Sequence, residues 1–271
     1  MKNLFLFLFL LVVFTSKAQD NRVSGLNSRQ FTKYWKVESE SPDYKVTFQG
    51  DTAEIVSPKG LTLWRKEKMS GKVTIEYDAC VVVESDGDRL SDLNCFWMAS
   101  DPQYPDNLWK REKWRSGIFL NCYSLQLYYL GYGGNHNSTT RFRRYDGDES
   151  GITNPKARPA ILKEYTDAGH LLKPNHWYHI KITNENNRVS YYIDGERLVD
   201  FRDAEPLREG WFGFRTTLSR TRITNFSYEC SSQEATAVPL QWIGETPRQD
   251  KVVSFGVPFD KGEVFPENKL R

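Results

Sequence analysis

Several common signals are missing from this sequence. Its four cysteines form no C-x-x-C pair, which argues against a zinc site. Because 37 basic residues face 35 acidic ones, the net charge implies neither a nucleic acid nor an anionic membrane as a partner. Serine nucleophile elbows, phosphate loops and glycine-rich nucleotide motifs are absent. No stretch has a convincing amphipathic helical pattern, and only residues 107–114 allow a short helical turn.

Long apolar runs are scarce, and the single one stands at the start of the chain. Lys2 precedes 11 unbroken apolar residues, 4–14, and the small residues Ser16 and Ala18 flank a cleavage point before Gln19. A helix needs ~20 residues to cross a hydrocarbon core of ~30 Å, so the run predicts a signal peptide. We expect cleavage near Ala18 and export to the periplasm or the extracellular medium, without membrane insertion.

Cysteines and aromatic residues leave alternatives open. The exported compartment permits disulfides, but Cys80, Cys95 and Cys122 lie in apolar strand-like runs where buried free thiols are equally reasonable. Eight Trp and 14 Tyr fit both sugar-stacking surfaces and an aromatic core.

Nearly every periodic segment alternates with the two-residue period of β-strands. The expected strands cover residues 45–48, 53–56, 71–83, 93–99, 117–132, 177–183, 189–193, 198–201, 210–217 and 221–228. Many strands at short spacing, joined by polar turns, predict an all-β sandwich.

The composition changes after Cys230. Residues 231–237 are small, polar and linker-like, and strand-like segments follow at 238–247 and 252–259. The remaining ~35 residues are too few to bury a core of their own. Either they pack on the sandwich or, as we favour, they begin a domain that continues beyond Arg271. The expected domains are a signal peptide (1–18), a sandwich (19–230), and a linker with the possible truncated start of a second β domain (231–271).

The last predicted strands carry a recognisable pattern. They read His-Trp-Tyr-His-Ile-Lys-Ile-Thr over 176–183, Tyr-Tyr-Ile-Asp-Gly-Glu-Arg-Leu-Val over 191–199 and Gly-Trp-Phe-Gly-Phe-Arg-Thr-Thr over 210–217. This resembles concanavalin A-like lectin/glucanase jelly rolls, including laminin-G-like domains and the secreted 3-keto-disaccharide hydrolase domain. The resemblance covers residues 30–230 and implies an all-β, concanavalin A-like β-sandwich (jelly roll) of two antiparallel sheets. Lectins, glycoside hydrolases and lyases share this fold, so the site must be argued separately.

Two further resemblances suggest a context. Residues 92–102 and 128–145 are similar to an uncharacterised secreted domain of glycan-degrading bacteria. The tail, with Val-Pro-Leu-Gln-Trp-Ile-Gly at 238–244 and Val-Ser-Phe-Gly-Val-Pro-Phe at 253–259, resembles the opening of the exo-rhamnogalacturonan lyase-like family. That resemblance implies an acidic, rhamnose-containing pectic glycan as the target. The catalytic part of that family would lie beyond Arg271, so none of its catalytic residues is carried over.

The most unusual segment covers residues 131–145. Its glycines let the backbone approach a ligand closely, and His136 and Asn137 stand at the centre of a polar loop. Arg141 and Arg143 share one face of a strand, and a guanidinium can bind a uronate carboxylate bidentately. We therefore predict ligand binding by Asn137, Arg141, Arg143 and Arg144. The alternative is a solvated hairpin whose arginines pair with Asp146, Asp148 and Glu149.

The same segment offers the residue types of a uronate lyase. Such an enzyme needs a group that neutralises the carboxylate, a base and an acid. Besides the arginines, the segment supplies His136 as a base and Tyr128 or Tyr145 as an acid. These three are the catalytic candidates, although their spacing matches no lyase family, and whether the protein is an enzyme stays open.

Hydrolase and metal chemistry have weaker signals. A glycosidase needs two carboxylates ~5 to 9 Å apart, and the glucanase pattern Glu-x-Asp-x-x-Glu is missing. We expect no cofactor. Asp86, Asp88 and Asp92 could bind Ca²⁺, but a solvated acidic turn is the favoured interpretation.

Other predicted ligand-binding residues lie on neighbouring strands. Trp97 could stack on a sugar, as could Trp109 and Trp114, and one of the three is expected in the core. Arg215 is expected on the sheet face that carries the ligand. Asn94 and Gln126 complete the set. The remaining histidines, His170, His176 and His179, are interpreted as structural.

These observations lead to one main hypothesis and two alternatives. We expect an exported accessory domain of a rhamnogalacturonan lyase-like protein that binds a polysaccharide or oligosaccharide, acidic and of pectin type. The first alternative is a polysaccharide lyase acting by β-elimination. The second, a protein-interaction module, rests on the fold resemblance alone.

Overall fold

A computed structural model describes residues 22–231, and its sheet contains fourteen strands. The strands are β1 (Arg22–Ser24), β2 (Trp35–Ser39), β3 (Lys45–Gln49), β4 (Thr52–Arg65), β5 (Met69–Ser70), β6 (Lys72–Val81), β7 (Leu93–Ser100), β8 (Gln126–Gly133), β9 (Thr139–Asp146), β10 (Lys163–Tyr165), β11 (Tyr178–Glu185), β12 (Arg188–Ile193), β13 (Glu196–Arg202) and β14 (Glu209–Ser231). The all-β prediction is confirmed.

Helical elements are short. They are α1 (Ser28–Tyr34), α2 (Glu112–Arg115), α3 (Gly134–Asn137) and α4 (Ser150–Thr153), with 3-10 turns η1 (Leu108–Arg111), η2 (Leu120–Ser124), η3 (Pro155–Ala157) and η4 (Ala168–His170). The expected turn near residues 107–114 corresponds to η1 and α2, whereas α1, whose first turn is capped by the Asn27 side chain, escaped the sequence analysis. Within the described part of the chain, no helix has the length and apolarity needed to cross a membrane.

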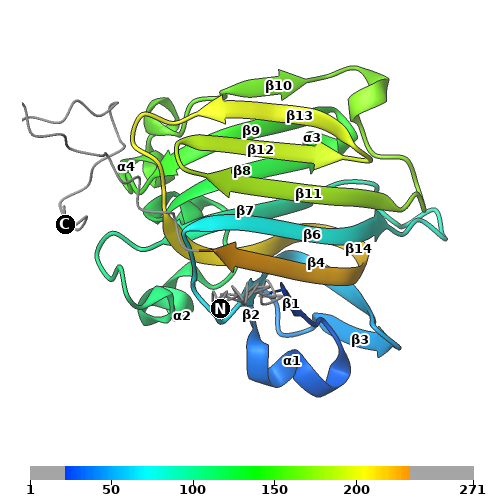
Figure 1. The fold of residues 1–271 in the computed structure, drawn as a ribbon. Coiled ribbons are helices and arrows are strands. Elements are labelled where there is room, and N and C mark those ends of the chain that lie inside the picture. Colours follow the sequence, from blue (N-terminus) through cyan, green and yellow to red (C-terminus); the bar gives the residue numbers. More distant parts are fainter. Residues whose placement is uncertain (1–21, 232–271) are drawn as a thin grey trace, which may run out of the picture.

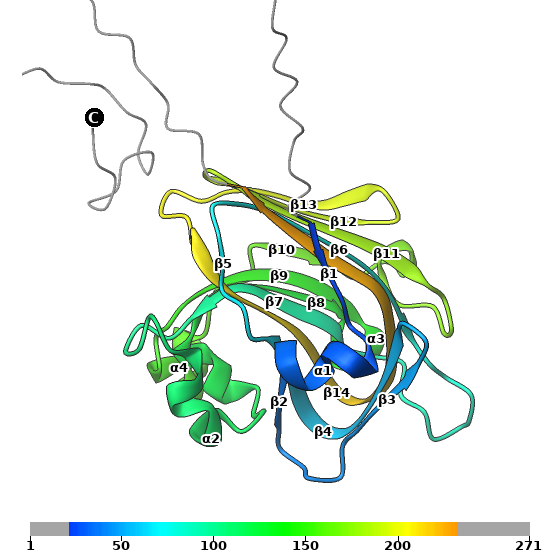
Figure 2. The same cartoon turned by 60° about the horizontal axis from the view of Figure 1, so that its bottom comes forward.

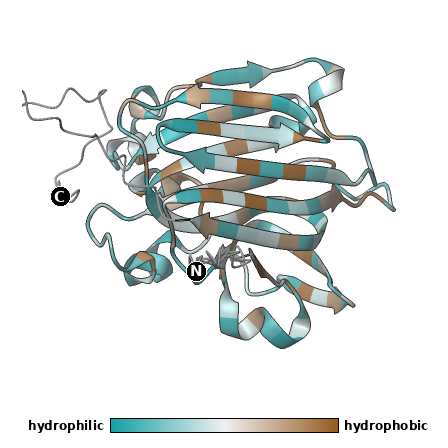
Figure 3. Ribbon diagram, viewed as in Figure 1, coloured by the Kyte–Doolittle hydropathy of each residue, from teal (hydrophilic) through white to brown (hydrophobic). Residues whose placement is uncertain are grey.

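The strands alternate as the two-residue period requires. In β6, Val73, Ile75, Tyr77 and Ala79 are buried while the residues between them are more exposed. Figure 3 shows the same alternation as teal and brown bands along the strands nearest the viewer. One face of each strand therefore points to a core, and the other is free to carry polar groups.

The strand order is β10-β9-β8-β7-β14-β6-β11-β12-β13. Strand β4 also pairs with β14 and carries β2 and β3 on its other edge. All of these pairings are antiparallel. Figures 1 and 2 show that the sheet folds back on itself, so that β6 and β11–β13 form one layer and β7–β10 form the other.

The long strand β14 connects the two layers. Its first part pairs with β7, from Trp211 opposite Ala99 to Arg215 opposite Asn94, and its last part pairs with β6. Between them Leu218 adopts a left-handed φ of 49°, at a register shift against β4. The expectation of two separate sheets is therefore corrected, because β14 and its partner β4 belong to both layers of one continuous curved sheet.

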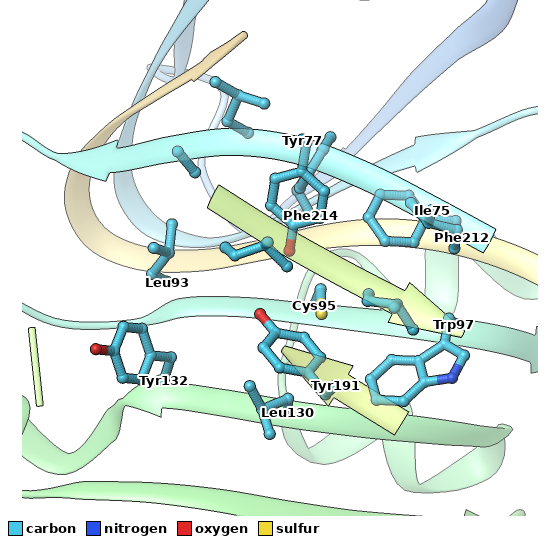
Figure 4. Packing of buried hydrophobic residues seen from close by; sticks show 14 of the residues in the cluster. Ile75, Tyr77, Leu93, Cys95, Trp97, Leu130, Tyr132, Tyr191, Phe212 and Phe214 are labelled. Atoms are coloured by element: carbon cyan, nitrogen blue, oxygen red, sulfur yellow. The ribbon is translucent and has the colours of Figure 1, made fainter. Parts of the chain in front are cut away.

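An aromatic core fills the space between the layers. Figure 4 shows Tyr77, Cys95, Trp97 and Tyr191 packed there, together with Phe212 and Phe214. The indole of Trp97 is fully buried in this cluster. All four cysteines of the chain are free thiols, and burial raises the pKa of Cys95 and of Cys122 to about 12.

A second, smaller core lies on the outer face of the β7–β8 layer. There Trp64, Phe96 and Tyr145 pack against residues of the segment 101–125, such as Leu108 and Cys122. Figure 2 shows α2 and α4 beneath this face. The segment thus covers part of the outer face of this layer.

Candidate functional site

Three of the predicted ligand-binding residues lie in one row across the outer face of the β7–β9 layer. Arg141 of β9 pairs with Gly131 of β8, Gly131 pairs with Asn94 of β7, and Asn94 pairs with Arg215 of β14. Their sequence neighbours Phe142, Cys95 and Phe214 point into the core, so the row itself faces outward. At ~4.8 Å per strand, the row is about 14 Å long.

Tyr129, which the sequence analysis did not select, lies beside this row. A Cβ atom on Gly131 would be 2.3 Å from the Tyr129 hydroxyl, so the missing side chain makes room for it. Burial raises the pKa of Tyr129, and Asp92 raises it further, while Arg215 and Arg143 oppose the shift. The hydroxyl therefore remains a protonated donor among charged side chains. The signal available in the sequence was its alternation with Leu130, which puts Tyr129 on the outer face.

The inner end of the row is covered. Arg215 donates hydrogen bonds to the Gly117 carbonyl and to Thr62, and the Phe119 ring lies 5.6 Å from its guanidinium carbon. Only 2% of Arg215 is exposed, and Asn94 is buried as well. Asn94 donates to Asp92 over 3.2 Å, and its carbonyl oxygen has no hydrogen-bond partner among the described residues. These two side chains are therefore buried within the protein, and Arg215 is covered by Gly117 and Phe119.

The three predicted arginines of β9 have different environments. Arg141 forms an ion pair with Glu164 of β10, and both side chains are about a third exposed. Arg144 faces the other way and donates to Asp203 at 2.7 Å, next to the Tyr128 hydroxyl. This matches the alternative interpretation, in which arginines pair with acidic residues, although the partners are different ones.

Arg143 differs from its neighbours. It donates to the Pro159 carbonyl, and no ion pair of its guanidinium occurs within residues 22–231. Arg158, which lies 5.8 Å from the centre of the Tyr123 ring, likewise has no ion-pair partner in the described part of the chain. Burial raises the pKa of Tyr123, and Arg158 and Arg143 oppose that shift, which places both cations near one phenol. Two cations without an ion-pair partner among residues 22–231 therefore lie near the Tyr123 phenol, and Arg143 bonds to the carbonyl of Pro159, the residue that follows Arg158.

The sequence analysis missed Arg158 for a physical reason. It lies in the irregular segment after α4, where its guanidinium donates to the Gly151 carbonyl at 3.3 Å. No periodicity relates residue 158 to β9, so only the folded chain brings it to Arg143.

The proposed catalytic residues are not assembled. His136 is exposed in the turn between β8 and β9, with left-handed φ values at Asn135, His136 and Asn137. Tyr128 and Tyr145 lie at the ends of β8 and β9 that are far from this turn. Both are fully buried, and they belong to different cores. Burial raises the pKa of both phenols. The three side chains therefore share no space in which one substrate could meet them.

Other predicted residues have structural environments. Asn137 accepts a hydrogen bond from the Leu172 backbone nitrogen at 2.8 Å and donates to the Leu172 carbonyl at 2.9 Å, so it holds the loop. Trp97 is enclosed in the core and offers no stacking surface. Gln126 is half-buried at the start of β8, opposite Asp146.

The acidic turn is held by protein groups. Asp88 accepts hydrogen bonds from the backbone nitrogens of Glu84 and Ser85, and Asp92 pairs with Arg89 at 3.1 Å. The residues that the structure describes contain no group of three or more His, Cys, Asp or Glu side chains able to hold a metal ion.

Comparison with known families gives two matches along the chain. The model of a domain of unknown function, DUF6250, matches residues 55–226. The model of the PcRGLX-like N-terminal RIFT barrel domain matches residues 236–271, which lie outside the described residues. Both resemblances expected from the sequence are thereby confirmed. No curated protein sequence matches this chain.

Solved structures show the same fold at low sequence identity. A protein of unknown function with a galectin-like fold from Bacillus subtilis is 16% identical, with a TM-score of 0.61 over 79% of this chain and 96% of that one. The exoplasmic/lumenal domain of VIP36, in its Ca²⁺/Man3GlcNAc-bound form, is 9% identical, with a TM-score of 0.52 over 80% of this chain and 90% of that one. The described domain therefore has a lectin-like fold.

Proposed function

Because this chain belongs to the DUF6250 family and has a lectin-like fold, we propose that it binds an acidic glycan without cleaving it. The observation that carries this proposal is the pair Arg143 and Arg158, two cations without an ion-pair partner in residues 22–231. Fold alone does not choose between lectins and enzymes, so the argument rests on this site.

A carboxylate suits the space beside these arginines. A guanidinium has five N–H donors, and Arg143 uses one of its amino groups to donate to the Pro159 carbonyl. The remaining donors can bind a uronate carboxylate in a charge-assisted, bidentate manner. The Tyr129 hydroxyl adds a neutral donor close by, since its pKa lies above the usual range. A uronic acid residue of a polysaccharide offers both the carboxylate and the hydroxyl groups that such a set would bind.

The neighbouring sequence supports a pectic glycan. The PcRGLX-like match over residues 236–271 suggests that the domain is an accessory module of a rhamnogalacturonan lyase-like protein. Within this proposal the domain is a concanavalin A-like jelly roll (19–230), followed by a linker and the start of a second β domain (231–271). Residues 1–18 act as a signal peptide for export. Sequencing the N-terminus of the secreted protein tests the export step, and a mature chain that still begins at Met1 would contradict it.

The positions of the catalytic candidates support binding rather than cleavage. Elimination needs a base and an acid close to the carboxylate. His136 precedes β9, whereas Tyr145 lies near its end, and the six residue steps from Thr139 to Tyr145 span about 20 Å. Arg143 therefore has no general base from the predicted set within reach.

Calorimetric titration with defined oligosaccharides tests the proposal. The probes are rhamnogalacturonan I backbone fragments, oligogalacturonates and their carboxyl-reduced forms. Wild-type protein is expected to bind an acidic probe, and Arg143→Met and Arg158→Met are each expected to weaken binding about 10- to 100-fold, since hydrogen bonds to charged groups contribute ~1.5–3 kcal/mol. Arg188→Met is the matched control, because Arg188 pairs with Asp200 on the other layer.

Two results would contradict the proposal. Unchanged affinity of both arginine variants would exclude this surface as the binding site for the acidic glycan. A rise in ultraviolet absorbance from an unsaturated uronide during incubation would show cleavage and would favour the lyase alternative.

A further inference from the structure

A polar groove lies on the opposite side of the molecule from the arginine pair. Its volume is about 500 Å³, and its lining includes Gln49, Thr52, Glu54, Trp177, Arg220 and Arg222. Glu54 of β4 pairs with Thr47 of β3 on one side and with Arg222 of β14 on the other. Figure 2 shows these three strands side by side. Their buried neighbours Ala53, Ile55 and Ile223 belong to the core between the layers, so the groove faces outward from that core.

Charged side chains in the groove are fixed by one another. Glu54 accepts two hydrogen bonds from Arg220, at 2.9 and 3.0 Å, and one from Arg222 at 2.7 Å. Glu84 accepts from the same two arginines at 2.7 and 3.3 Å. Two positive and two negative charges cancel, and the hydrogen bond from Arg220 is the main reason that the pKa of Glu54 lies below its usual range. The network therefore presents oriented donors and acceptors without net charge.

Trp177 supplies the apolar part of the groove. It precedes Tyr178, which pairs with Ala79, while Cys80 pairs with Arg222. Cys80 is on the outward side of β6 by alternation and yet only 2% exposed. Trp177 itself is 43% exposed, so nearly half of a large apolar side chain remains in contact with water. Packing among residues 22–231 leaves that surface uncovered.

This combination matches the chemistry of a neutral sugar. A pyranose has an apolar C–H face that packs on an aromatic ring, and its edge carries hydroxyl groups that both donate and accept hydrogen bonds. The guanidinium groups of Arg220 and Arg222 can donate to such hydroxyls, and the carboxylate of Glu54 can accept from them. Among the described residues that line the groove, both arginines are paired with carboxylates, so an ionised sugar would find no uncompensated cation there, in contrast to the surface around Arg143.

We propose that this groove is a second glycan-binding site, specific for a neutral pyranose unit that stacks on Trp177. The groove is independent of the proposed acidic-glycan site around Arg143 and Arg158, because the core lies between the two faces. With one site on each face, a single domain can hold two glycan chains, or two parts of a branched glycan, at the same time.

Titration with neutral oligosaccharides tests the groove. The probes are β-1,4-linked galacto-, manno-, gluco- and xylohexaose, and the readouts are affinity and tryptophan emission. At least one hexaose is expected to bind and to change the emission, and Trp177→Ala is expected to weaken that binding at least about tenfold through loss of the stacking surface. Trp114→Ala is the matched control, since Trp114 is also 43% exposed but lies on α2.

A second variant blocks the groove without removing its contacts. Thr47→Arg places a long side chain on the exposed edge strand β3, opposite Glu54, and is expected to weaken binding as Trp177→Ala does. Arg143→Met should bind the neutral hexaose as the wild-type protein does. The inference is overturned if no neutral hexaose binds at millimolar concentration, or if folded Trp177→Ala and Thr47→Arg both keep wild-type affinity. Neither result bears on the proposed acidic-glycan site around Arg143 and Arg158.

Discussion

Gly131 determines where the Tyr129 hydroxyl lies. This glycine has an ordinary negative φ, so its importance comes from the space above it rather than from backbone freedom. That space holds the end of the Tyr129 side chain, whose ring also packs against Phe96 and Phe119. A single hydrogen in place of a methyl group thus positions a donor beside Arg143 and Asp92.

The residue-scale prediction is that Gly131→Ala disturbs both stability and binding. The new methyl group would force the phenol out of its position, and overpacking of this kind costs about 1–3 kcal/mol of unfolding free energy. Affinity for the acidic probe is expected to fall with it. Denaturant titration and calorimetry measure the two effects. Gly87→Ala is the control, since nothing lies within 4 Å of its Cβ position, and an equal effect of both substitutions would contradict this explanation.

A buried ion pair attaches the segment 101–125 to the sheet, and another holds the segment together. Arg115, which is fully buried, donates to Glu38 of β2 at 3.0 Å and to the Leu108 carbonyl at 2.7 Å. Arg111 pairs with Asp101 at 2.7 Å. Burial raises the pKa of Glu38, although Arg115 opposes the shift. The packing of the segment 101–125 therefore depends on buried charges, each of which is stable only when its partner is present.

At the scale of the element, we predict that Arg115→Ala destabilises the protein by about 3–5 kcal/mol, because it leaves the Glu38 carboxylate buried without its partner. The unpaired carboxyl would have a folded pKa further above its unfolded value. The folded state then binds more protons than the unfolded state in that range, so the loss of stability should shrink as the pH falls. Urea titrations at several pH values measure this.

Two further variants check the cause. Trp114→Ala, next to Arg115 but exposed, should change stability by less than about 1 kcal/mol. The double variant Glu38→Leu with Arg115→Met should recover most of the loss, since apolar residues often replace a buried ion pair without penalty. A loss in Arg115→Ala that does not vary with pH would contradict the role of Glu38.

The two layers of the molecule share their central strands. Strand β14 pairs with β7 in one layer and with β6 in the other, and β4 accompanies it through both. A layer cannot separate from its partner without breaking these strands. The surface around Arg143 and Arg158 and the groove around Trp177 therefore belong to one folding unit.

For the whole molecule we therefore predict a single cooperative unfolding transition of the sandwich. Tryptophan fluorescence, which reports on both cores, and far-ultraviolet circular dichroism, which reports on strands, should give coincident urea curves. Trp97 lies in the core between the layers and Trp64 in the outer core, so each core has its own reporter. The Trp64→Phe and Trp97→Phe variants each remove one of these reporters. If the fluorescence and circular dichroism curves of either variant have different urea midpoints, the layers unfold independently.

The sequence by itself determined the strands, because alternation of apolar and polar residues follows directly from the geometry of an extended chain. It also placed Arg141 and Arg143 on one face, and the motifs at 176–217 indicated the lectin-like fold. It could not show that Trp97 and Tyr145 are enclosed, since an aromatic side chain in a strand suits a core and a sugar platform equally well.

Only the tertiary structure decided which polar residues meet. Arg158 reaches Arg143 from an irregular segment, and Glu54, Arg220 and Trp177 come from three distant parts of the chain. Likewise Arg215, which points outward as alternation predicts, is covered by Phe119 and the Gly117 carbonyl. Alternation fixes the face on which a side chain lies, because that is a local property of the backbone. Whether that face is open, and what stands next to it, depends on long-range strand pairing and on the segments that pack over the sheet.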